Sequence, residues 1–250
     1  MTARAKITVV QFPDGIGNWN LVYRFFRLRK RVFIDQMNWS LDQYDRLEFE
    51  QYDTLGATYI IAHEGQDILG GARLIRTDAK QPQSNGKVQY SYMIRDAYLG
   101  LLPGLPSNLC DGEPPTDEKT WELTRFVSAE NAHVGERILR EACEFLKSVG
   151  ASECLFLGPP TFLRLAKRMG FSPKKMGKIV GNKDGRFLAF TCPIVGDGEM
   201  SDAEIIRRLQ EIVSEKNSVQ RRVLLLRLAE TDVPLRLAEL TEKAFLSVHS

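Results

Sequence analysis

The sequence predicts an α/β fold, in which a mixed central sheet is flanked by helices and followed by a C-terminal helical extension. Three observations lead to this prediction. A pair of adjoining strand patterns lies in the first third of the chain, two strand–helix units follow it, and a second hairpin pattern closes the series. After that hairpin the apolar residues recur at helical spacing only.

The first helix is predicted from about Asn18 to Met37, after a short apolar segment at Ile7 to Val10. Its apolar residues recur at helical spacing and leave basic residues between them. An acidic, irregular stretch from Leu41 to Asp53 follows. The apolar positions are Leu21, Val22, Phe25, Leu28, Val32 and Phe33, and the basic ones are Arg24, Arg27, Lys30 and Arg31.

A β-hairpin is predicted next, because Thr58 to His63 and Ile68 to Arg76 are strand patterns joined by a short turn containing glycine. From about Asp78 to Lys119 the chain is rich in proline and glycine, and we expect a long excursion with one short helix at Ile94 to Tyr98. Functional loops are often drawn from such segments.

After the excursion, the pattern of strand followed by helix occurs twice before a closing hairpin. A helix is expected where apolar residues from Val134 to Val149 share one face, and Gly150 ends it. The hairpin turns at Asn182 to Gly185. The other predicted elements are strands at Trp121 to Ser128 and Cys154 to Leu157, a helix at Thr161 to Met169, and the hairpin as a whole at Ile179 to Pro193.

Two regions are predicted, residues 1–196 and a helical extension at residues 197–250. The extension begins with a capping box, in which Ser201 precedes Glu204 by three residues. The apolar stripe Ile205, Leu209 and Ile212 describes a helix that covers a surface. That surface belongs either to this chain or to a second subunit, so the oligomeric state stays open.

Composition excludes several classes of protein. The 250 residues carry a net charge of only +2, which argues against a nucleic-acid-binding protein. No stretch has the length and apolarity of a membrane span or a signal peptide, so we expect a cytoplasmic protein with no membrane partner. The four cysteines lack metal-ligand spacing, and we expect no metal site and reduced thiols.

Charged residues lie among aromatic or apolar ones at three places. Arg29 precedes Phe33 on the first helix, with Trp39 just past its end. The acidic stretch holds Glu48-x-Glu50-x-x-Asp53. Taken alone, these first two patterns are more simply explained by a solvated helix face, a core aromatic residue and an exposed loop.

The third place is the strand that contains Glu122 and Arg125, and Arg73 lies likewise within the hairpin. Residues three apart on a regular strand face opposite sides, so one of the two charges points inward unless the strand is bulged. An inward charge needs a partner or a task, because an unpaired buried ion costs several kcal/mol.

These residues resemble the acyl-homoserine-lactone (autoinducer) synthases. Four motifs stand in the family's order and approximate spacing: Arg29-x-x-x-Phe33 with Trp39, Glu48-x-Glu50-x-x-Asp53, Gly71-Ala72-Arg73-Leu74, and Glu122-x-x-Arg125. Each is weak alone, but together they span residues 29–126 in order. The resemblance implies a fold like that of the GNAT acyltransferases. The family usually has aspartate where Glu50 stands, and Tyr98 is the best match to an aromatic residue in the excursion.

The resemblance also implies an activity. The amine of S-adenosylmethionine, a substrate rather than a cofactor, attacks an acyl thioester delivered by acyl-carrier protein or coenzyme A, and the product closes to a lactone. Glu122 is the candidate catalytic base. The bulged strand is expected to supply a backbone N–H for the oxyanion. The candidate substrate-binding residues are Arg29, Phe33, Trp39, Glu50, Asp53, Arg73, Tyr98 and Arg125.

Two other functions fit the same sequence. One is a GNAT-type N-acyltransferase acting on another amine, although the stretch Glu130 to Glu136 has a single glycine where coenzyme A is usually cradled. The other is a non-catalytic, partner-binding module. Since acyl-carrier protein is acidic, a basic docking surface is expected, and a late cluster of basic residues is the candidate: Arg164, Lys167, Arg168, Lys174, Lys175, Lys178 and Lys183.

Overall fold

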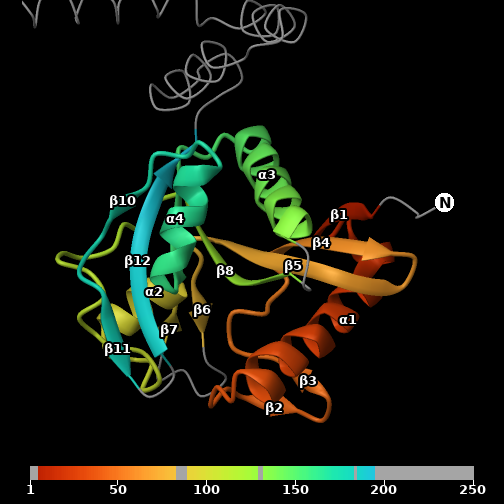
Figure 1. Cartoon of the computed structure of the whole chain (residues 1–250), viewed down its shortest axis with the longest axis horizontal. Helices are drawn as coiled ribbons and strands as arrows, with labels where there is room; N and C mark the ends of the chain where they lie inside the picture. The colour runs from red at the N-terminus through yellow and green to blue at the C-terminus, as the bar shows by residue number, and fades with distance from the viewer. Residues whose placement is uncertain (1–4, 83–88, 129–131, 183–184, 195–250) are drawn as a thin grey trace, which may run out of the picture. The chain divides into compact units, whose positions relative to one another are not determined.

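An eight-stranded mixed sheet forms the centre of the structure, a computed structural model that describes residues 5–82, 89–128, 132–182 and 185–194 (Figure 1). Its strands lie in the order β1–β4–β5–β8–β9–β12–β10, with β11 paired to β12. Their bounds are β1 Lys6–Gln11, β4 Thr58–Glu64, β5 Asp67–Arg76, β8 Thr120–Ser128, β9 Glu153–Gly158, β10 Lys174–Lys175, β11 Val180–Asn182 and β12 Gly185–Pro193.

The helices and the small strands complete the architecture. The helical segments are η1 Ile16–Asn18, α1 Trp19–Arg29, the π-helix η2 Lys30–Gln36, α2 Met93–Tyr98, α3 Ala132–Ser148 and α4 Pro160–Arg168. Two short strand pairs lie outside the main sheet: β2 Gln43–Tyr44 with β3 Leu47–Glu48, and β6 Gln81–Pro82 with β7 Gln89–Tyr90.

Helices α1 and α3 cover opposite faces of β5, and two glycines allow both to approach. A Cβ atom on Gly70 would lie 3.0 Å from Ile138 of α3, and one on Gly71 would lie 2.8 Å from Phe25 of α1. Successive residues of a strand point to opposite faces, so the sheet lies between the two helices. The predicted mixed sheet flanked by helices is therefore confirmed.

The sheet opens between β8 and β9. These two strands are parallel, and α3 connects them, as a crossover requires. They pair only from Thr120 to Leu123 and from Glu153 to Phe156, after which β8 continues beside β5 and β9 continues beside β12. Beyond the divergence, the β5–β8 register shifts at a bulge, and Arg125 has a positive φ of 51°. The bulge that would let Glu122 and Arg125 face the same side of this strand is therefore present.

Several elements differ from the sequence prediction. The segment near Ile7 to Val10 is a full edge strand, β1, which pairs with β4. The first helix ends as an α-helix at Arg29 and continues as η2. The irregular acidic stretch contains the β2–β3 pair. Both predicted hairpins are confirmed, and β11 and β12 pair beside the expected turn.

The chain divides into two units, residues 1–165 with 173–194, and residues 166–172 with 195–250. The sheet and the site described below belong to the first unit. The predicted helical extension, residues 197–250, lies outside the described residues. Among the residues that the structure describes, no helix has the length and apolar character needed to cross a membrane.

Candidate active site

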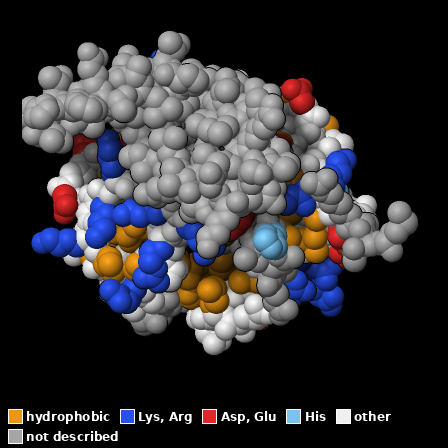
Figure 2. All heavy atoms as spheres, turned by 45° about the horizontal axis from the view of Figure 1, so that its top comes forward, with side chains coloured by type: hydrophobic (Ala, Val, Ile, Leu, Met, Phe, Trp, Pro, Cys, Tyr) orange, Lys and Arg blue, Asp and Glu red, His pale blue; other side chains and the backbone are white. Residues whose placement is uncertain are grey.

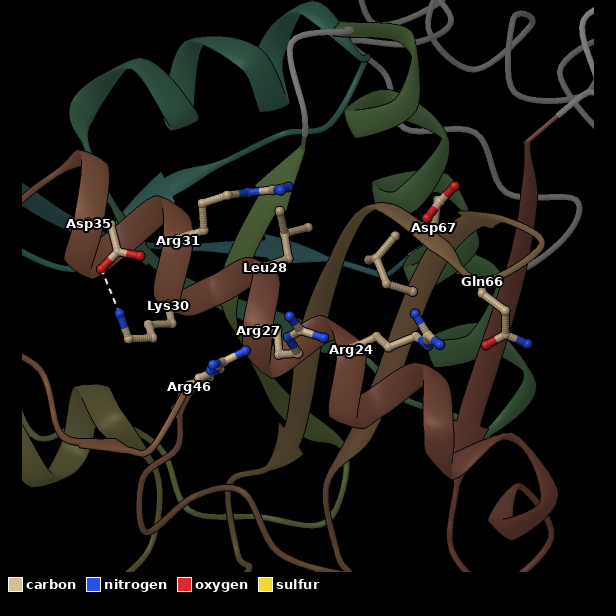
Figure 3. Close-up of a pocket in the computed structure, with 10 residues that line it drawn as sticks. Arg24, Arg27, Leu28, Lys30, Arg31, Asp35, Arg46, Gln66 and Asp67 are labelled. Carbon is tan, nitrogen blue, oxygen red and sulfur yellow. Dashed lines mark hydrogen bonds and ion pairs between the residues drawn. The ribbon is translucent and has the colours of Figure 1, made fainter.

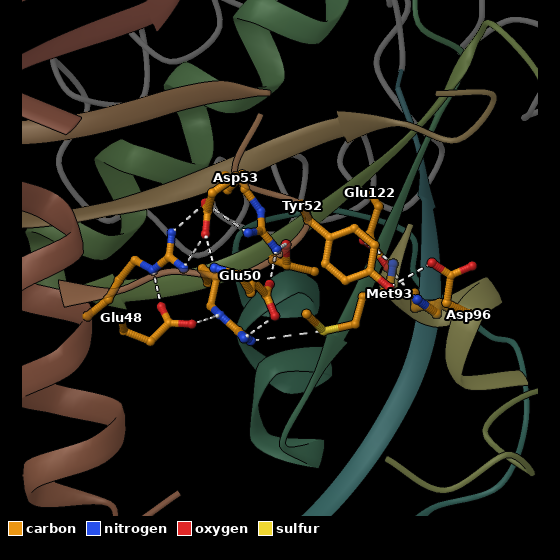
Figure 4. A network of polar contacts seen from close by, with 12 residues as sticks. Glu48, Glu50, Tyr52, Asp53, Met93, Asp96 and Glu122 are labelled. Atoms are coloured by element: carbon orange, nitrogen blue, oxygen red, sulfur yellow. Dashed lines mark hydrogen bonds and ion pairs between the residues drawn. The ribbon is translucent and has the colours of Figure 1, made fainter. Parts of the chain in front are cut away.

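Six charged side chains form a closed ring of alternating sign, which we call the ion ring: Arg29, Glu48, Arg125, Glu50, Arg73 and Asp53 (Figure 4). Arg29 binds Asp53 in bidentate fashion, at 2.7 and 2.8 Å, and donates from Nε to Glu48. The other links are Arg125–Glu48 at 3.1 Å, Arg125–Glu50 at 2.6 Å, Arg73–Glu50 at 2.5 Å and Arg73–Asp53 at 2.9 Å. Three positive and three negative charges therefore cancel within the ring.

Burial makes the charges of the ion ring costly to desolvate and strengthens the attraction between them. Arg29, Arg73, Glu48 and Asp53 have fully buried side chains, whereas Arg125 and Glu50 retain 7% and 10% exposure. Burial opposes ionisation of Asp53, but Arg73 and Arg29 outweigh it and hold the pKa of this carboxyl below its usual range. For the same reason the pKa of Arg29 is raised, because Asp53 and Glu48 outweigh its burial. Asp53 and Arg29 are therefore ionised at neutral pH.

Local structure brings the six side chains together. Arg29 is the last residue of α1, Glu48 ends β3, and Arg73 lies in β5. A tight turn places Glu50 and Asp53 side by side, since the Asp53 N–H donates to the Glu50 carbonyl and the Glu50 N–H donates to the Asp53 carboxylate. Arg125 reaches the ring from the bulge of β8. A regular strand would not present both Glu122 and Arg125 to the interior.

A cavity of about 480 Å³ begins where β8 and β9 part, and the exposed edge of the ring forms part of its wall. Arg125 of β8 and Leu157 of β9 both line it. Glu50 and Arg125 are the ring members that reach the cavity. The full lining is Trp39, Ser40, Leu41, Asp42, Glu50, Gln51, Met93, Leu102, Pro103, Gly104, Leu105, Arg125, Leu157, Gly158 and Phe187.

Aromatic side chains adjoin the charged edge. Trp39 lines the cavity and stacks on Phe33, with ring centroids 5.2 Å apart and planes 5° apart. The Arg125 guanidinium lies 5.9 Å from the Phe33 ring centroid. One face of Trp39 is thus covered by Phe33, and Phe33 itself is buried between Trp39 and an arginine. Of the two, Trp39 is the one that reaches the cavity.

Glu122 lies behind the cavity and is fully buried. Its carboxylate accepts the backbone N–H groups of Met93, at 3.0 Å, and Ile94, at 2.7 Å, at the start of α2. Met93 in turn lines the cavity and touches Arg125. Burial raises the pKa of Glu122 to about 7, although the two N–H donors and Arg73 act in the opposite direction. Such a carboxyl accepts and releases protons near neutral pH.

A second buried carboxyl, that of Asp96, belongs to the same helix. Asp96 accepts hydrogen bonds from the Tyr52 hydroxyl at 2.7 Å and from the Ser91 N–H at 2.9 Å (Figure 4). Burial raises the pKa of Asp96, and it raises that of Tyr52 as well. Tyr52 lies within the turn from Glu50 to Asp53, so these contacts join the ion ring to α2.

The structure places the predicted site residues at three depths. Trp39, Glu50 and Arg125 line the cavity, while Arg29, Phe33, Asp53 and Arg73 form the layer beneath them. Tyr98, at the end of α2, packs against the hydrophobic core and is not among the lining residues. Glu48 closes the ion ring but is not among the substrate-binding residues predicted from the sequence. The acidic run itself was the signal that pointed to it.

The expected basic docking cluster is only partly described. Arg164, Lys174, Lys175 and Lys178 are exposed. On the face shown in Figure 2, basic side chains gather on the left, the side on which Figure 1 draws β10 and β12. Lys167 and Arg168 belong to the second unit, and Lys183 lies outside the described residues.

Comparison with known proteins gives one consistent family. A family model described as autoinducer synthase matches residues 18–199. An acyl-homoserine-lactone synthase of Pectobacterium parmentieri is 42% identical over 197 residues, which cover 76% of this chain and 83% of the relative.

Solved structures of such enzymes share the fold. A CoA-dependent acyl-homoserine lactone synthase, BjaI, with SAM and isopentyl-CoA, superposes with a TM-score of 0.62 at 18% identity, covering 86% of this chain and 92% of that one. TofI in a ternary complex with an inhibitor and MTA has a TM-score of 0.60 at 22% identity, with 80% and 96% covered. The expected GNAT-like fold is confirmed.

Proposed function

The chain belongs to the autoinducer synthase family, and on that premise we propose that it is an acyl-homoserine-lactone synthase. It transfers an acyl group from a thioester to the amine of S-adenosylmethionine, and it closes the lactone with release of methylthioadenosine. The observation that carries this proposal is the cavity at the β8–β9 opening, whose wall combines Trp39 with the charged edge of the ion ring.

The cavity suits a substrate that carries charges of both signs. The sulfonium of S-adenosylmethionine is attracted by the π face of Trp39 and by the Glu50 carboxylate. Its own carboxylate pairs with the Arg125 guanidinium, which reaches the cavity from the β8 bulge. The buried ring members hold Glu50 and Arg125 in place, so the charges are fixed before the substrate arrives.

Acyl transfer needs a base and an oxyanion donor. In this proposal Glu122, with its pKa of about 7, receives the amine proton through a water molecule as nitrogen attacks the thioester carbonyl. The new N–C bond forms, the C–S bond breaks, and the proton passes to the departing thiolate. A backbone N–H at the bulge of β8 is the proposed donor to the developing oxyanion.

Lactonisation depends on holding one conformer. The carboxylate oxygen attacks the γ-carbon, the C–S⁺ bond breaks, and neutral methylthioadenosine leaves. Because both groups belong to one molecule, the enzyme contributes chiefly by keeping the chain folded back. We propose that Arg125 does this by fixing the carboxylate beside the Trp39 wall. In this scheme S-adenosylmethionine is a substrate, and the reaction needs no resident cofactor.

The acyl donor is proposed to be acyl-carrier protein or acyl-coenzyme A. BjaI is described as CoA-dependent, which supports the second source. We assign the protein to the cytoplasm, where thiols stay reduced, and none of its four cysteines forms a disulfide.

Methylthioadenosine release tests the proposal. Purified protein, S-adenosylmethionine and a panel of acyl thioesters of varied chain length, on both carrier protein and coenzyme A, should yield methylthioadenosine. Release of thiol without methylthioadenosine, in the presence of another amine, would indicate a different N-acyltransferase. The absence of both products from folded protein would leave a non-catalytic binding module.

A further inference from the structure

A second hollow, of about 560 Å³, lies along the outer side of α1 and η2 and is separate from the active-site cavity (Figure 3). Residues of α1 and η2 line most of it, with Arg46 at one end and the tip of the β4–β5 hairpin at the other (Figure 3). We call it the arginine groove. Its lining is Arg24, Arg27, Leu28, Lys30, Arg31, Asp35, Arg46, Gln66, Asp67 and Ile68.

The cations of this groove are poorly neutralised. Five of its ten lining residues are basic and two are acidic. Lys30 pairs with Asp35 at 2.7 Å. Within the described part of the chain, Arg24, Arg27, Arg31 and Arg46 make no ion pair, and the buried Nε of Arg24 has no hydrogen-bond partner. Guanidinium groups held near one another without counter-charges favour an anionic ligand.

The spacing of the arginines matches an extended ligand. Arg24, Arg27 and Arg31 recur at i, i+3 and i+7 and follow one side of the helix over about 10 Å. Carboxylates at the same spacing on another helix would face them. The lining contains no aromatic side chain and only two apolar ones, Leu28 and Ile68, so it offers nothing on which a nucleotide base would stack.

The groove lies at the end of the sheet where β8 leads into α3. Ile68 is two residues from Gly70, which pairs with Ser128, the last residue of β8. Arg125, three residues earlier on the same strand, lines the active-site cavity. A partner seated in the groove is therefore close to the strand along which the cavity opens.

We propose that the arginine groove docks an acidic helix of the protein that carries the acyl group, an inference that rests on the proposed synthase function. Paired carboxylates on that helix meet Arg24, Arg27 and Arg31 and orient the carrier before its thioester enters the cavity. Attraction between exposed charges mainly speeds encounter and weakens with added salt. This surface differs from the basic cluster near β10 to which the sequence pointed.

Charge reversal tests the groove against that cluster. The variants are Arg27→Glu with Arg31→Glu, and, as the matched control, Lys174→Glu with Lys175→Glu; all four side chains are exposed. Two titrations are made for each variant and for the unsubstituted protein: binding of acyl-carrier protein, and KM for the same acyl group on carrier protein and on coenzyme A. The groove variant should bind carrier protein roughly tenfold or more weakly, with KM for acyl-coenzyme A unchanged.

Three results would overturn the proposal: equal carrier binding by all proteins, loss of binding only in the β10 variant, or an unsubstituted protein that turns over acyl-coenzyme A without binding the carrier. Carrier binding that depends on the groove, without methylthioadenosine from any donor, would instead contradict the proposed synthase function alone. A thermal melt verifies folding. If the double reversal unfolds the protein, Arg27→Gln with Arg31→Gln should still weaken carrier binding several-fold.

Discussion

The ion ring and the arginine groove both use arginines of the helical segment α1–η2, but they use them differently. Arg29 is fully buried and meets two carboxylates, whereas Arg27 and Arg31 are exposed and meet none. A buried guanidinium must be paired, because the desolvation of an unpaired ion would cost several kcal/mol of folding stability. An exposed one is free to serve a partner. Side-chain burial therefore separates arginines that build the site from arginines that are available for docking.

The largest effect is expected from removal of a ring arginine. Arg29→Met leaves Glu48 and Asp53 buried without their shared partner and should lower the free energy of unfolding by about 3–5 kcal/mol. Arg27→Met, on the same helix but exposed, should change it little. Urea titrations of both variants give the comparison. Equal losses would show that burial does not distinguish the two arginines.

Next in size is the effect of the proposed base. Glu122→Gln should lower kcat about 10²–10⁴-fold while binding of S-adenosylmethionine is retained. Since protonated Glu122 cannot accept a proton, kcat/KM of the wild type should rise as pH increases through about 7. In the pH profile of the variant, the rise near pH 7 should be absent. The rise due to the substrate amine, whose pKa is near 7.7–8.0, should remain.

Asp96→Asn is the matched control for Glu122. Asp96 is a buried residue of α2 itself, and burial raises its pKa too, but its contacts are with Tyr52 and Ser91. Its substitution should leave the limb near pH 7 in place. A folded Glu122→Gln variant of normal rate would remove Glu122 from the mechanism and leave it only its contacts with Met93 and Ile94.

A smaller effect is expected at the cavity wall. Trp39→Ala should raise the apparent KM for S-adenosylmethionine several-fold to about thirtyfold, since a cation–π contact contributes roughly 0.5–2 kcal/mol. The KM for the acyl donor should change little. Tyr44→Ala, at an exposed aromatic residue outside the cavity lining, serves as the control. Similar increases for both substrates would mean that Trp39 supports this lobe generally.

The sequence predicted the fold better than it predicted the depth of each site residue. Strand patterns joined by short turns that contain glycine located both hairpins. The edge strand β1 was missed, since its short apolar run has no turn partner and pairs instead with the distant β4. The resemblance to the family's motifs brought Arg29, Arg73 and Arg125 into one set, but it did not show that Glu48 closes their ring.

Tertiary contacts explain the rest. The basic residues between the apolar positions of the first helix looked like a solvated face. Together with Arg46 and the β4–β5 hairpin that face lines a groove, and no local pattern connects those segments. The sequence indicated a bulge near Arg125 only indirectly. Glu122 and Arg125, three residues apart, can face the same side of the strand only if the strand is bulged between them.

Product analysis with labelled substrate tests the central claim most directly. S-adenosylmethionine carrying carbon-13 in its aminobutyryl carbons is incubated with the protein and a thioester that supports turnover, and the products are resolved by liquid chromatography and mass spectrometry. The account predicts one labelled acyl-homoserine lactone for each unlabelled methylthioadenosine released. Accumulation of labelled acylated S-adenosylmethionine without methylthioadenosine, or label in no acylated product, would contradict it.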